Sequence, residues 1–348
     1  MKLSSTKAIE ETHAAIGDVV GLREQTTLQR AMTNQAFWVA AALLALVAFM
    51  TWLEPSFGTA DNVTNITRNF APLAIMSLGM TVVIVTGGID LSVGSVMGLV
   101  AIVTGMLLTW NYSWYVAFAA GLMSGLACGA FNGFFVAYIG MPSFVVTLGM
   151  LSIARSLAVV ISGNQMLYKF GPDAPIVRAI GQAKWPLHAP AGWAPPWMPE
   201  FSSHFWVMVI LALVLGAIFM FTAWARHLYA IGSNESAARL TGVSVDWIKF
   251  QAYVFSSFTA SVASLLLLGY SGSAINAMGT GYELRVIAGT VIGAAFLEVI
   301  RNALLMAGID SNWQGAFVGM FIVIAVLVGM QTSGTSLLAT IREWVAWR

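Results

Sequence analysis

Apolar runs of near-spanning length follow one another along the chain, separated by polar or glycine-rich stretches. A helix needs about 20 apolar residues to cross the hydrocarbon layer of a membrane. The pattern therefore predicts an all-α fold, a polytopic transmembrane helical bundle with broken membrane helices. Nine spans are expected, at residues 36–53, 69–86, 92–110, 114–139, 143–162, 204–224, 248–270, 284–307 and 313–330.

Composition supports a membrane protein and excludes several other classes. Of the 348 residues, 58% are hydrophobic and 9% are charged, whereas a soluble domain has about 25% charged residues. Membrane lipid is therefore an expected partner. The formal net charge is +1, and without a basic cluster no nucleic acid is expected to bind. One cysteine and four scattered histidines give no pattern of metal ligands, so no metal site is expected.

The apolar runs define a transmembrane domain, residues 36–330, between a polar N-terminal tail, 1–35, and a C-terminal tail, 331–348. No cleavage site follows the first run, so the first span is expected to be retained. Two loops are long. The loop at 163–203 holds most of the prolines and should not form a regular helix, whereas the loop at 225–247 is compatible with a helix.

Lysine and arginine placement predicts the orientation of the spans. The N-terminal tail carries four basic residues and is therefore expected in the cytoplasm. Counting spans from there places the loop at 225–247 and the short link at 140–142 in the cytoplasm. The loop at 163–203 then lies outside. The basic residues of the tail are Lys2, Lys7, Arg23 and Arg30.

A polar stretch, TGGIDLSVGS at residues 86–95, interrupts two apolar runs. The run at 71–86 would rise about 24 Å as a helix, short of the roughly 30 Å hydrocarbon layer. The sequence therefore predicts a break inside the membrane, with Asp90 or Ser92 capping the next helix. Asp90 either holds this break together or faces a substrate path, since intramembrane carboxylates are costly and often functional.

Glycines recur every four residues along the span at 114–139. They form a smooth stripe that favours close packing with another helix. Asn132, beside the stripe, either bonds a neighbouring helix or lines a pathway. The four glycines are Gly121, Gly125, Gly129 and Gly133.

Three stretches carry a family resemblance: TGGIDLSVGS, FNGFFVAYIGMPSFVVTLGMLSIARSLA and YAIGSNESAARLTGVSVDWIKFQAYVFSS. In this order, and over roughly residues 70–330, the chain resembles the membrane permeases of ribose-type sugar ABC importers. That group includes ribose, xylose, arabinose, galactose and autoinducer-2 systems. The resemblance implies a type II ABC importer permease-like fold and alternating-access import of a monosaccharide across the bacterial inner membrane. It does not identify the sugar.

The resemblance also implies partners. A separate ABC ATPase subunit would bind ATP and Mg²⁺, so this chain itself is expected to hold no cofactor and to be no enzyme. A periplasmic sugar-binding protein would deliver the solute. A second permease subunit would complete the pathway as a homodimer or heterodimer. Asn302 joins Asp90, Ser92 and Asn132 as a candidate for the pathway or the broken helices.

In this family a short coupling helix in the cytoplasmic loop docks on the ATPase, and GSNESAARLTG, residues 232–242, matches its pattern. The residue types suit such a helix, since Asn234 or Ser233 can cap it and Gly242 can end it. An ordinary amphipathic connector is the alternative interpretation. The candidate coupling residues are Gly232, Asn234, Glu235, Ala237, Ala238, Arg239 and Gly242.

The alternative function is an ion-coupled secondary transporter of a small polar solute. That class usually needs acidic or histidine relays within its spans, and Asp90 and Glu298 are the candidates here. An intramembrane enzyme is a third class, but no recognisable catalytic set supports it. Glu298 and Arg301 are three residues apart, so a local ion pair is expected if both are helical.

The run at 284–307 joins two segments that are separate in permeases of this type. The glycine-rich stretch expected between them, after Gly293, is absent. A deletion is the favoured interpretation. The alternatives are a partial gene product, or a re-entrant fold in which Gly289 and Gly293 break the run and return the C-terminus to the cytoplasm.

Overall fold

A computed structural model describes residues 35–185, 199–310, 313, 315–317 and 319–320. The two tails, residues 186–198 of the long loop and most of the span expected at 313–330 lie outside the described residues. The chain divides into two compact units, one formed by residues 1–46 with 329–348 and the other by residues 47–328. The second unit holds the candidate site.

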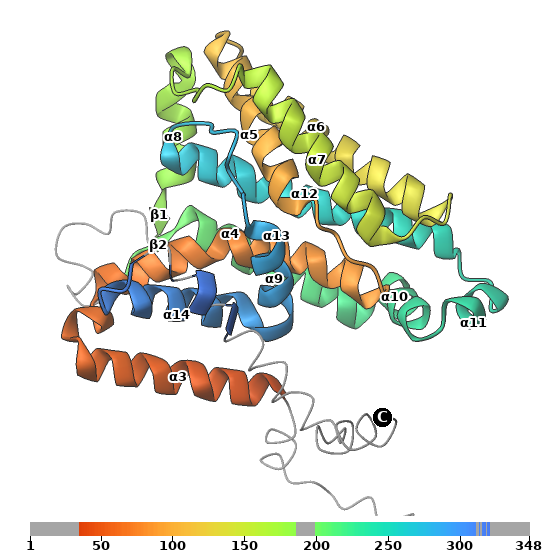
Figure 1. Cartoon of the computed structure of the whole chain (residues 1–348), viewed down its shortest axis with the longest axis horizontal. Helices are drawn as coiled ribbons and strands as arrows, with labels where there is room; N and C mark the ends of the chain where they lie inside the picture. Colours follow the sequence, from red (N-terminus) through yellow and green to blue (C-terminus); the bar gives the residue numbers. More distant parts are fainter. Residues whose placement is uncertain (1–34, 186–198, 311–312, 314, 318, 321–348) are drawn as a thin grey trace, which may run out of the picture. The chain divides into compact units, whose positions relative to one another are not determined.

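The described chain is helical almost throughout (Figure 1). The α-helices are α3 (Gln35–Leu53), α4 (Ala60–Val85), α5 (Val93–Thr109), α6 (Trp114–Ala137), α7 (Ser143–Ser162), α8 (Ala174–Gln182), α9 (Ser203–Phe221), α10 (Ala223–Ser233), α11 (Glu235–Leu240), α12 (Val245–Ser271), α13 (Tyr282–Ala288) and α14 (Ala294–Met306). Short 3₁₀ turns occupy Pro55–Gly58 and Gly171–Asp173. Strands β1 (Lys184–Trp185) and β2 (Phe201–Ser202) pair antiparallel, with Lys184 opposite Ser202.

The predicted polytopic helical fold is confirmed, but the expected spans change. Within the described residues, six helices are long and apolar enough to cross a bilayer: α3, α4, α6, α7, α9 and α12. Helix α5 is shorter, at 17 residues, and lies buried among other helices. The run expected at 284–307 is divided into α13, a π-helical turn and α14.

Helix α4 corrects the expectation of a short second span. It begins at Ala60, nine residues before the predicted start, because Thr59 caps it by accepting a hydrogen bond from the Asn62 backbone. Its 26 residues rise about 39 Å, enough to cross the hydrocarbon layer. The first turns of α4 carry polar side chains, so the hydropathy pattern did not include residues 60–68 in the span.

The loop expected at 163–203 also contains a helix that was not predicted. Helix α8 places Pro175 in its first turn, where a missing backbone N–H costs nothing. Val177 and Gly181 form its buried face against α12. A Cβ on Gly181 would collide with the backbone of Gly269, so the two helices touch through their glycines.

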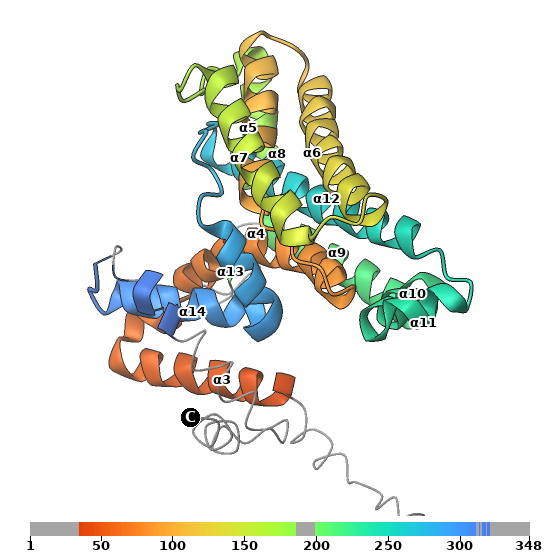
Figure 2. The same cartoon turned by 45° about the vertical axis from the view of Figure 1, so that its right-hand side comes forward.

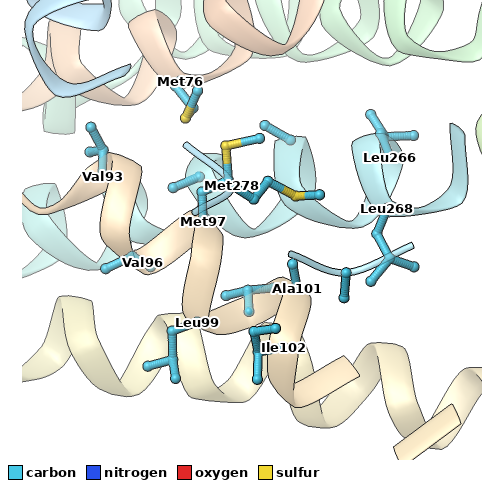
Figure 3. Close-up of a cluster of buried hydrophobic side chains, with 14 of the residues drawn as sticks. Met76, Val93, Val96, Met97, Leu99, Ala101, Ile102, Leu266, Leu268 and Met278 are labelled. Atoms are coloured by element: carbon cyan, nitrogen blue, oxygen red, sulfur yellow. The ribbon is translucent and has the colours of Figure 1, made fainter. Parts of the chain in front are cut away.

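The main hydrophobic core surrounds α5 (Figure 3). Met76 of α4, Met97 of α5 and Leu266 of α12 are buried in it together. Side chains on several sides of α5 are inaccessible, including Val96 and Ile102. A helix that is hydrophobic all round behaves as a core element, and α5 is such a helix.

The glycine stripe of α6 packs closely, as predicted. A Cβ on Gly129 would lie 2.8 Å from the Ser257 side chain, and one on Gly133 would lie 2.8 Å from the Phe250 carbonyl oxygen, both on α12. Gly125 likewise faces Ser261 of α12. The backbones of α6 and α12 therefore approach each other as only small residues allow.

The run at 284–307 turns sharply, as Figures 1 and 2 show for α13 and α14. A π-helical turn, Gly289–Gly293, joins them. Gly293 has a φ of +113°, which L-residues with side chains avoid, whereas Gly289 keeps an ordinary helical φ of −61°. The re-entrant interpretation is thus correct about a break at Gly293. The destination of the C-terminus lies outside the described residues.

Glu298 is the buried charge of this region, with a side chain that is 2% exposed. The expected ion pair with Arg301 is confirmed at 3.6 Å. Arg285 of α13 makes a second, shorter ion pair at 3.2 Å. Glu298 therefore fastens the two helices on either side of the turn.

Candidate functional site

A break separates α4 from α5 where the sequence predicts one, and its depth in the membrane stays a prediction. Helix α4 ends at Val85, and Gly87 turns the chain with a φ of +80°. Gly88 lies under the Tyr253 hydroxyl, where a side chain would collide. From there the backbone forms no regular element until Ser92, which precedes α5.

Asp90 lies at the centre of a buried network in this break. Its Oδ1 accepts hydrogen bonds from the Ser92 backbone N–H at 2.9 Å and the Ser92 hydroxyl at 2.6 Å. Its Oδ2 accepts one from the Ser256 hydroxyl of α12 at 2.8 Å. Asn132 of α6 donates from Nδ2 to the Ser92 hydroxyl at 2.9 Å. The network therefore joins the break to both α6 and α12.

This geometry favours the structural interpretation of Asp90. Asp90, Ser92, Asn132 and Ser256 are all fully buried. Ser92 does not cap α5 with its own side chain, and Asp90 bonds the N–H of Ser92 rather than one in the first turn of α5. The prediction that Asp90 or Ser92 caps α5 with its side chain is therefore wrong. The Asp90 carboxylate instead bonds Ser92, the residue before the helix. Asn132 Oδ1 has no partner among the described residues.

Helix α7 holds the other side of the break. The Ile89 backbone N–H donates to the Ser143 hydroxyl at 3.2 Å. Ser143 is the first residue of α7, directly after the predicted cytoplasmic link. Thr147, one turn further along, donates to the Ser143 carbonyl at 2.9 Å and lies 3.4 Å from the Ile89 carbonyl.

A cavity of about 660 Å³ opens beside the break. Its wall combines Thr86–Gly88 of the break with the 140–142 link, the first two residues of α7, residues 231–235, two residues at the end of α6 and three residues of α11 and α12. Those three are Arg239, Lys249 and Tyr253. Asp90 is not part of the lining. The break, the link and the candidate coupling segment therefore meet at one end of the bundle.

The short helix expected in the candidate coupling segment is α11, whereas Gly232 and Ser233 belong to the end of α10. Helix α10 ends at Ser233, and Asn234 begins α11 by accepting a hydrogen bond from the Ala237 N–H at 2.9 Å. The predicted Asn234 cap is thereby confirmed. At the other end, Gly242 has a φ of +84°. Its N–H reaches the Arg239 carbonyl, which makes the glycine stop that was predicted.

Four charged residues fix α11 to the base of α12. Arg239 forms two contacts with the Asp246 carboxylate, at 2.6 and 3.1 Å. Lys249 pairs with Glu235 at 3.0 Å, and Arg239 approaches Glu235 at 3.7 Å. Individually, such exposed pairs add little stability. Together they set the orientation of α11, which is too short to keep a fixed orientation without such contacts.

The exposed face of α11 differs from the one expected. Ala238 is 4% exposed and packs in the same cluster as Val245 and Ile248, so it cannot touch a partner. Ala237 is exposed. Leu240 is 90% exposed. Sequence reasoning missed Leu240, although its spacing of three from Ala237 places both on one face of a helix.

Gly232 connects this segment to the break. A Cβ on Gly232 would collide with the carbonyl oxygen of Val85, the last residue of α4. The end of α10 therefore rests directly on the point where α4 gives way to the break. Glycine is required there because the two backbones touch.

Asn302 lies apart from the other pathway candidates. Its side-chain amide exchanges two hydrogen bonds with that of Asn62, each 3.0 Å long. The pair joins α14 to the first turn of α4, and Asn62 also donates to the Phe57 carbonyl. The structure thus assembles Asp90, Ser92 and Asn132 but places Asn302 in a separate brace.

Comparison with known proteins identifies the family. Residues 62–345 match the family described as branched-chain amino acid transport system / permease component. The probable ABC transporter permease protein y4mJ of Sinorhizobium fredii is 36% identical, with 83% of this chain and 87% of that protein aligned. No solved structure matches this chain.

Two further relatives have named solutes. The ribose import permease protein RbsC of Escherichia coli is 34% identical, covering 82% of this chain and 91% of that protein. The autoinducer 2 import system permease protein LsrC of Salmonella typhi is 30% identical, covering 83% of this chain and 84% of that protein. Together with its apolar spanning helices, these matches show that the chain belongs to the ABC transporter permease family, as a multi-pass protein of the bacterial inner membrane.

Proposed function

We propose that the chain is the permease subunit of an ABC importer that carries a monosaccharide into the cytoplasm. The named solutes of two relatives, ribose and autoinducer 2, support a small polyhydroxylated solute. A separate ATPase subunit binds ATP and Mg²⁺, a periplasmic binding protein delivers the sugar, and a second permease subunit completes the pathway. The work of this chain is alternating access, without chemistry of its own.

The observation that carries this proposal is the construction of α11. An Asn234-capped helix, pinned by ion pairs to α12, presents an apolar side chain, Leu240, to solvent. A single exposed leucine is common on a protein surface, but here it belongs to a helix that is fixed in place beside the cavity, where it offers a partner an apolar contact. The ATPase is that partner, and α11 is the coupling helix, at the cytoplasmic end of the bundle.

The contacts behind α11 supply a route for movement. ATP-driven closure of the ATPases displaces α11 together with α10 and the base of α12. Gly232 of α10 then presses on the Val85 carbonyl at the start of the break. The break is in turn bonded to α7 through Ile89 and Ser143. A displacement at the coupling helix thus reaches α4, the break and α7 through direct contacts.

The ion-coupled alternative receives no support from its two candidate carboxylates. Asp90 accepts three hydrogen bonds in a closed network. Glu298 is paired with Arg285 and Arg301. A relay needs a carboxylate that meets water and exchanges protons, and both groups are committed to holding helices together.

Reconstitution tests the function. Proteoliposomes containing this permease, the ATPase encoded beside it and the neighbouring binding protein should take up a sugar from a panel of pentoses and hexoses. Uptake should require ATP and all components. Uptake by the purified permease alone, driven by a proton or sodium gradient, would contradict the proposal and favour a secondary transporter.

Cross-linking tests the docking surface separately. Single cysteines at exposed positions of α11, Ser236, Ala237 and Leu240, should capture the ATPase with a short thiol-reactive reagent. A cysteine at the buried Ala238 serves as the matched negative position. Failure of all the exposed positions to capture the ATPase would remove α11 as the coupling helix.

We also propose that the chain lacks a pathway-lining stretch after Gly293. The alignment with y4mJ extends over 308 positions yet includes 83% of the 348 residues, so this chain has gaps in it. The sharp turn at Gly293 lies where the two family segments meet. Inserting the corresponding stretch of RbsC before Ala294 should raise sugar uptake. Unchanged uptake by a well-assembled variant would contradict a harmful deletion.

A further inference from the structure

Residues 272–281, here named the descending segment, link α12 to α13 without forming a helix. The segment begins at Gly272, which ends α12 with a φ of +63°. Ala274 pairs with Leu167, just beyond α7, through two backbone hydrogen bonds of 2.9 and 2.7 Å. The segment ends where Gly279 meets Gly94 in the first turn of α5.

Three glycines of α5 line the track of this segment. A Cβ on Gly105 would lie 2.7 Å from the Ala274 side chain. One on Gly98 would lie 2.9 Å from the Met278 carbonyl oxygen, and Gly94 faces Gly279. Residues 94 and 105 are about 16 Å apart along a helix, roughly half the hydrocarbon thickness. The segment therefore descends into the membrane along α5, with Met278 reaching the core beside Met97 (Figure 3).

Arg155 of α7 secures the segment at this depth. Its Nη1 donates to the carbonyl oxygen of Asn276 at 2.6 Å and to that of Met278 at 3.2 Å. Arg155 lies eight residues before Gly163, about 12 Å below the end of α7. An arginine inside the membrane is costly and usually marks a solute path. Non-helical backbone at that depth persists only where protein buries it or where it lines a water-filled cavity.

One side of the segment is packed and the other is open. Met278 and Ala274 are buried against α5, whereas Ile275 is 39% exposed and Thr280 is also exposed. Apart from Arg155, a side-chain contact holds its outer part: the Asn276 amide donates to Asn164 Oδ1 at 2.7 Å. Gly279 and Gly281, each with a φ of +77°, allow bending at the inner end.

We propose that the descending segment is the outer gate of the solute pathway, and that Arg155 is the residue that positions it when closed. Opening releases Asn276 from Asn164 and swings the segment off the glycine track of α5. The guanidinium and the freed carbonyl groups then face the path, where they suit a hydroxyl-rich neutral solute. The inference rests on the proposed function, because only a transport subunit needs such a gate.

Locking the gate tests it. In a Cys128→Ala background, which removes the sole cysteine, Asn164→Cys and Asn276→Cys are combined and bridged with a short bifunctional methanethiosulfonate. D-Ribose is the probe, in the reconstituted complete transporter. Bridging should abolish uptake, and reductant should restore it. Each single cysteine should give the same uptake before and after treatment with the reagent.

Two outcomes would overturn the proposal. One is full uptake by a protein whose bridge is confirmed by thiol counting, since a static segment tolerates a cross-link. The other is failure of the two cysteines to bridge, since the segment would then not lie where the hydrogen bond places it.

A second measurement tests whether the gate moves without assuming that D-ribose is the solute. In the Cys128→Ala background, Thr280→Cys is labelled from outside with a membrane-impermeant maleimide. If the gate moves, adding ATP and the binding protein should change the labelling rate, even if D-ribose is not the solute. An unchanged rate would contradict a moving gate. Absent D-ribose uptake by the unmodified chain would count against the choice of sugar alone.

Arg155 variants test positioning. Arg155→Lys keeps a donor and should retain part of the transport, whereas Arg155→Met should lose it. In Arg155→Met, the labelling rate of Thr280→Cys should differ from that with arginine even without ATP, because the gate no longer closes. A rate indistinguishable from that with arginine would show that the arginine does not hold the gate.

Discussion

Gly232 lies against the carbonyl oxygen of Val85 so closely that no side chain fits between them. Gly232→Ala would force the end of α10 away from the break, at a cost of about 1–3 kcal/mol for overpacking. We expect ATP hydrolysis by the assembled transporter to persist while sugar uptake falls strongly. Measuring ATP hydrolysis and sugar uptake in the same proteoliposomes gives the amount of sugar transported per ATP hydrolysed, which should fall.

Gly216→Ala in α9 is the matched control for Gly232→Ala. A Cβ at Gly216 meets nothing within 4 Å, and alanine favours a helix over glycine. This variant should therefore couple normally. A similar loss in both variants would show that the Gly232 contact has no special role.

Leu240 is 90% exposed, so changing it should leave the fold intact. Leu240→Asp should weaken binding to the ATPase by about 2 kcal/mol, roughly 30-fold, if the side chain is an interface anchor. Leu240→Met should bind nearly as the original does. Thermal unfolding in detergent provides the check that both variants are folded. Equal affinity of all three proteins for the ATPase would argue against an anchor at this position.

Asp90→Leu should destabilise the break by about 2–4 kcal/mol, because it leaves buried donors of Ser92 and Ser256 without an acceptor. Asp90→Asn should cost less, since an amide oxygen still accepts from Ser92. Detergent thermal unfolding and the yield of assembled transporter should rank the proteins in this order. Unimpaired stability in the leucine variant would show that the network does not hold the break.

Substitution of Glu298 should destabilise the protein more than substitution of Arg301, its more exposed partner. Glu298→Leu leaves Arg285 and Arg301 unpaired beside a buried site, which typically costs about 3–5 kcal/mol. Arg301→Gln should cost less, because its side chain is 37% exposed and Arg285 still pairs with the glutamate. Thermal unfolding of the two variants tests the order. The reverse order would place the main stabilising contact on Arg301.

Local rules explain what was predicted correctly. The turn at Gly87, the Asn234 cap and the stop at Gly242 each depend on neighbours within a few residues. The stripe from Gly121 to Gly133 predicted close packing because its period matches one face of a helix. Such features depend on residues that are close together in the chain, so a single sequence is sufficient to find them.

Long-range partners explain what was missed. Asn62 precedes the second span expected at 69–86, yet it lies inside α4, where Asn302, 240 residues away, satisfies its side chain. Ser256 gave no sign that it would bond Asp90, 166 residues away. Ala238, a candidate coupling residue, is buried and Leu240 is exposed because the direction of α11 is set by α12.

The tight packing of the α6 glycines on α12 has a mechanical consequence. Two helices in backbone contact cannot slide or bend independently, so they act as one stiff lever whose base carries Asp246 and Lys249, the residues that hold α11. With 27 residues, α12 is about 40 Å long, and a tilt of about 5° at its base shifts its far end by about 3.5 Å. A small rotation of α12 on one side of the membrane therefore becomes a larger displacement of its end on the other side.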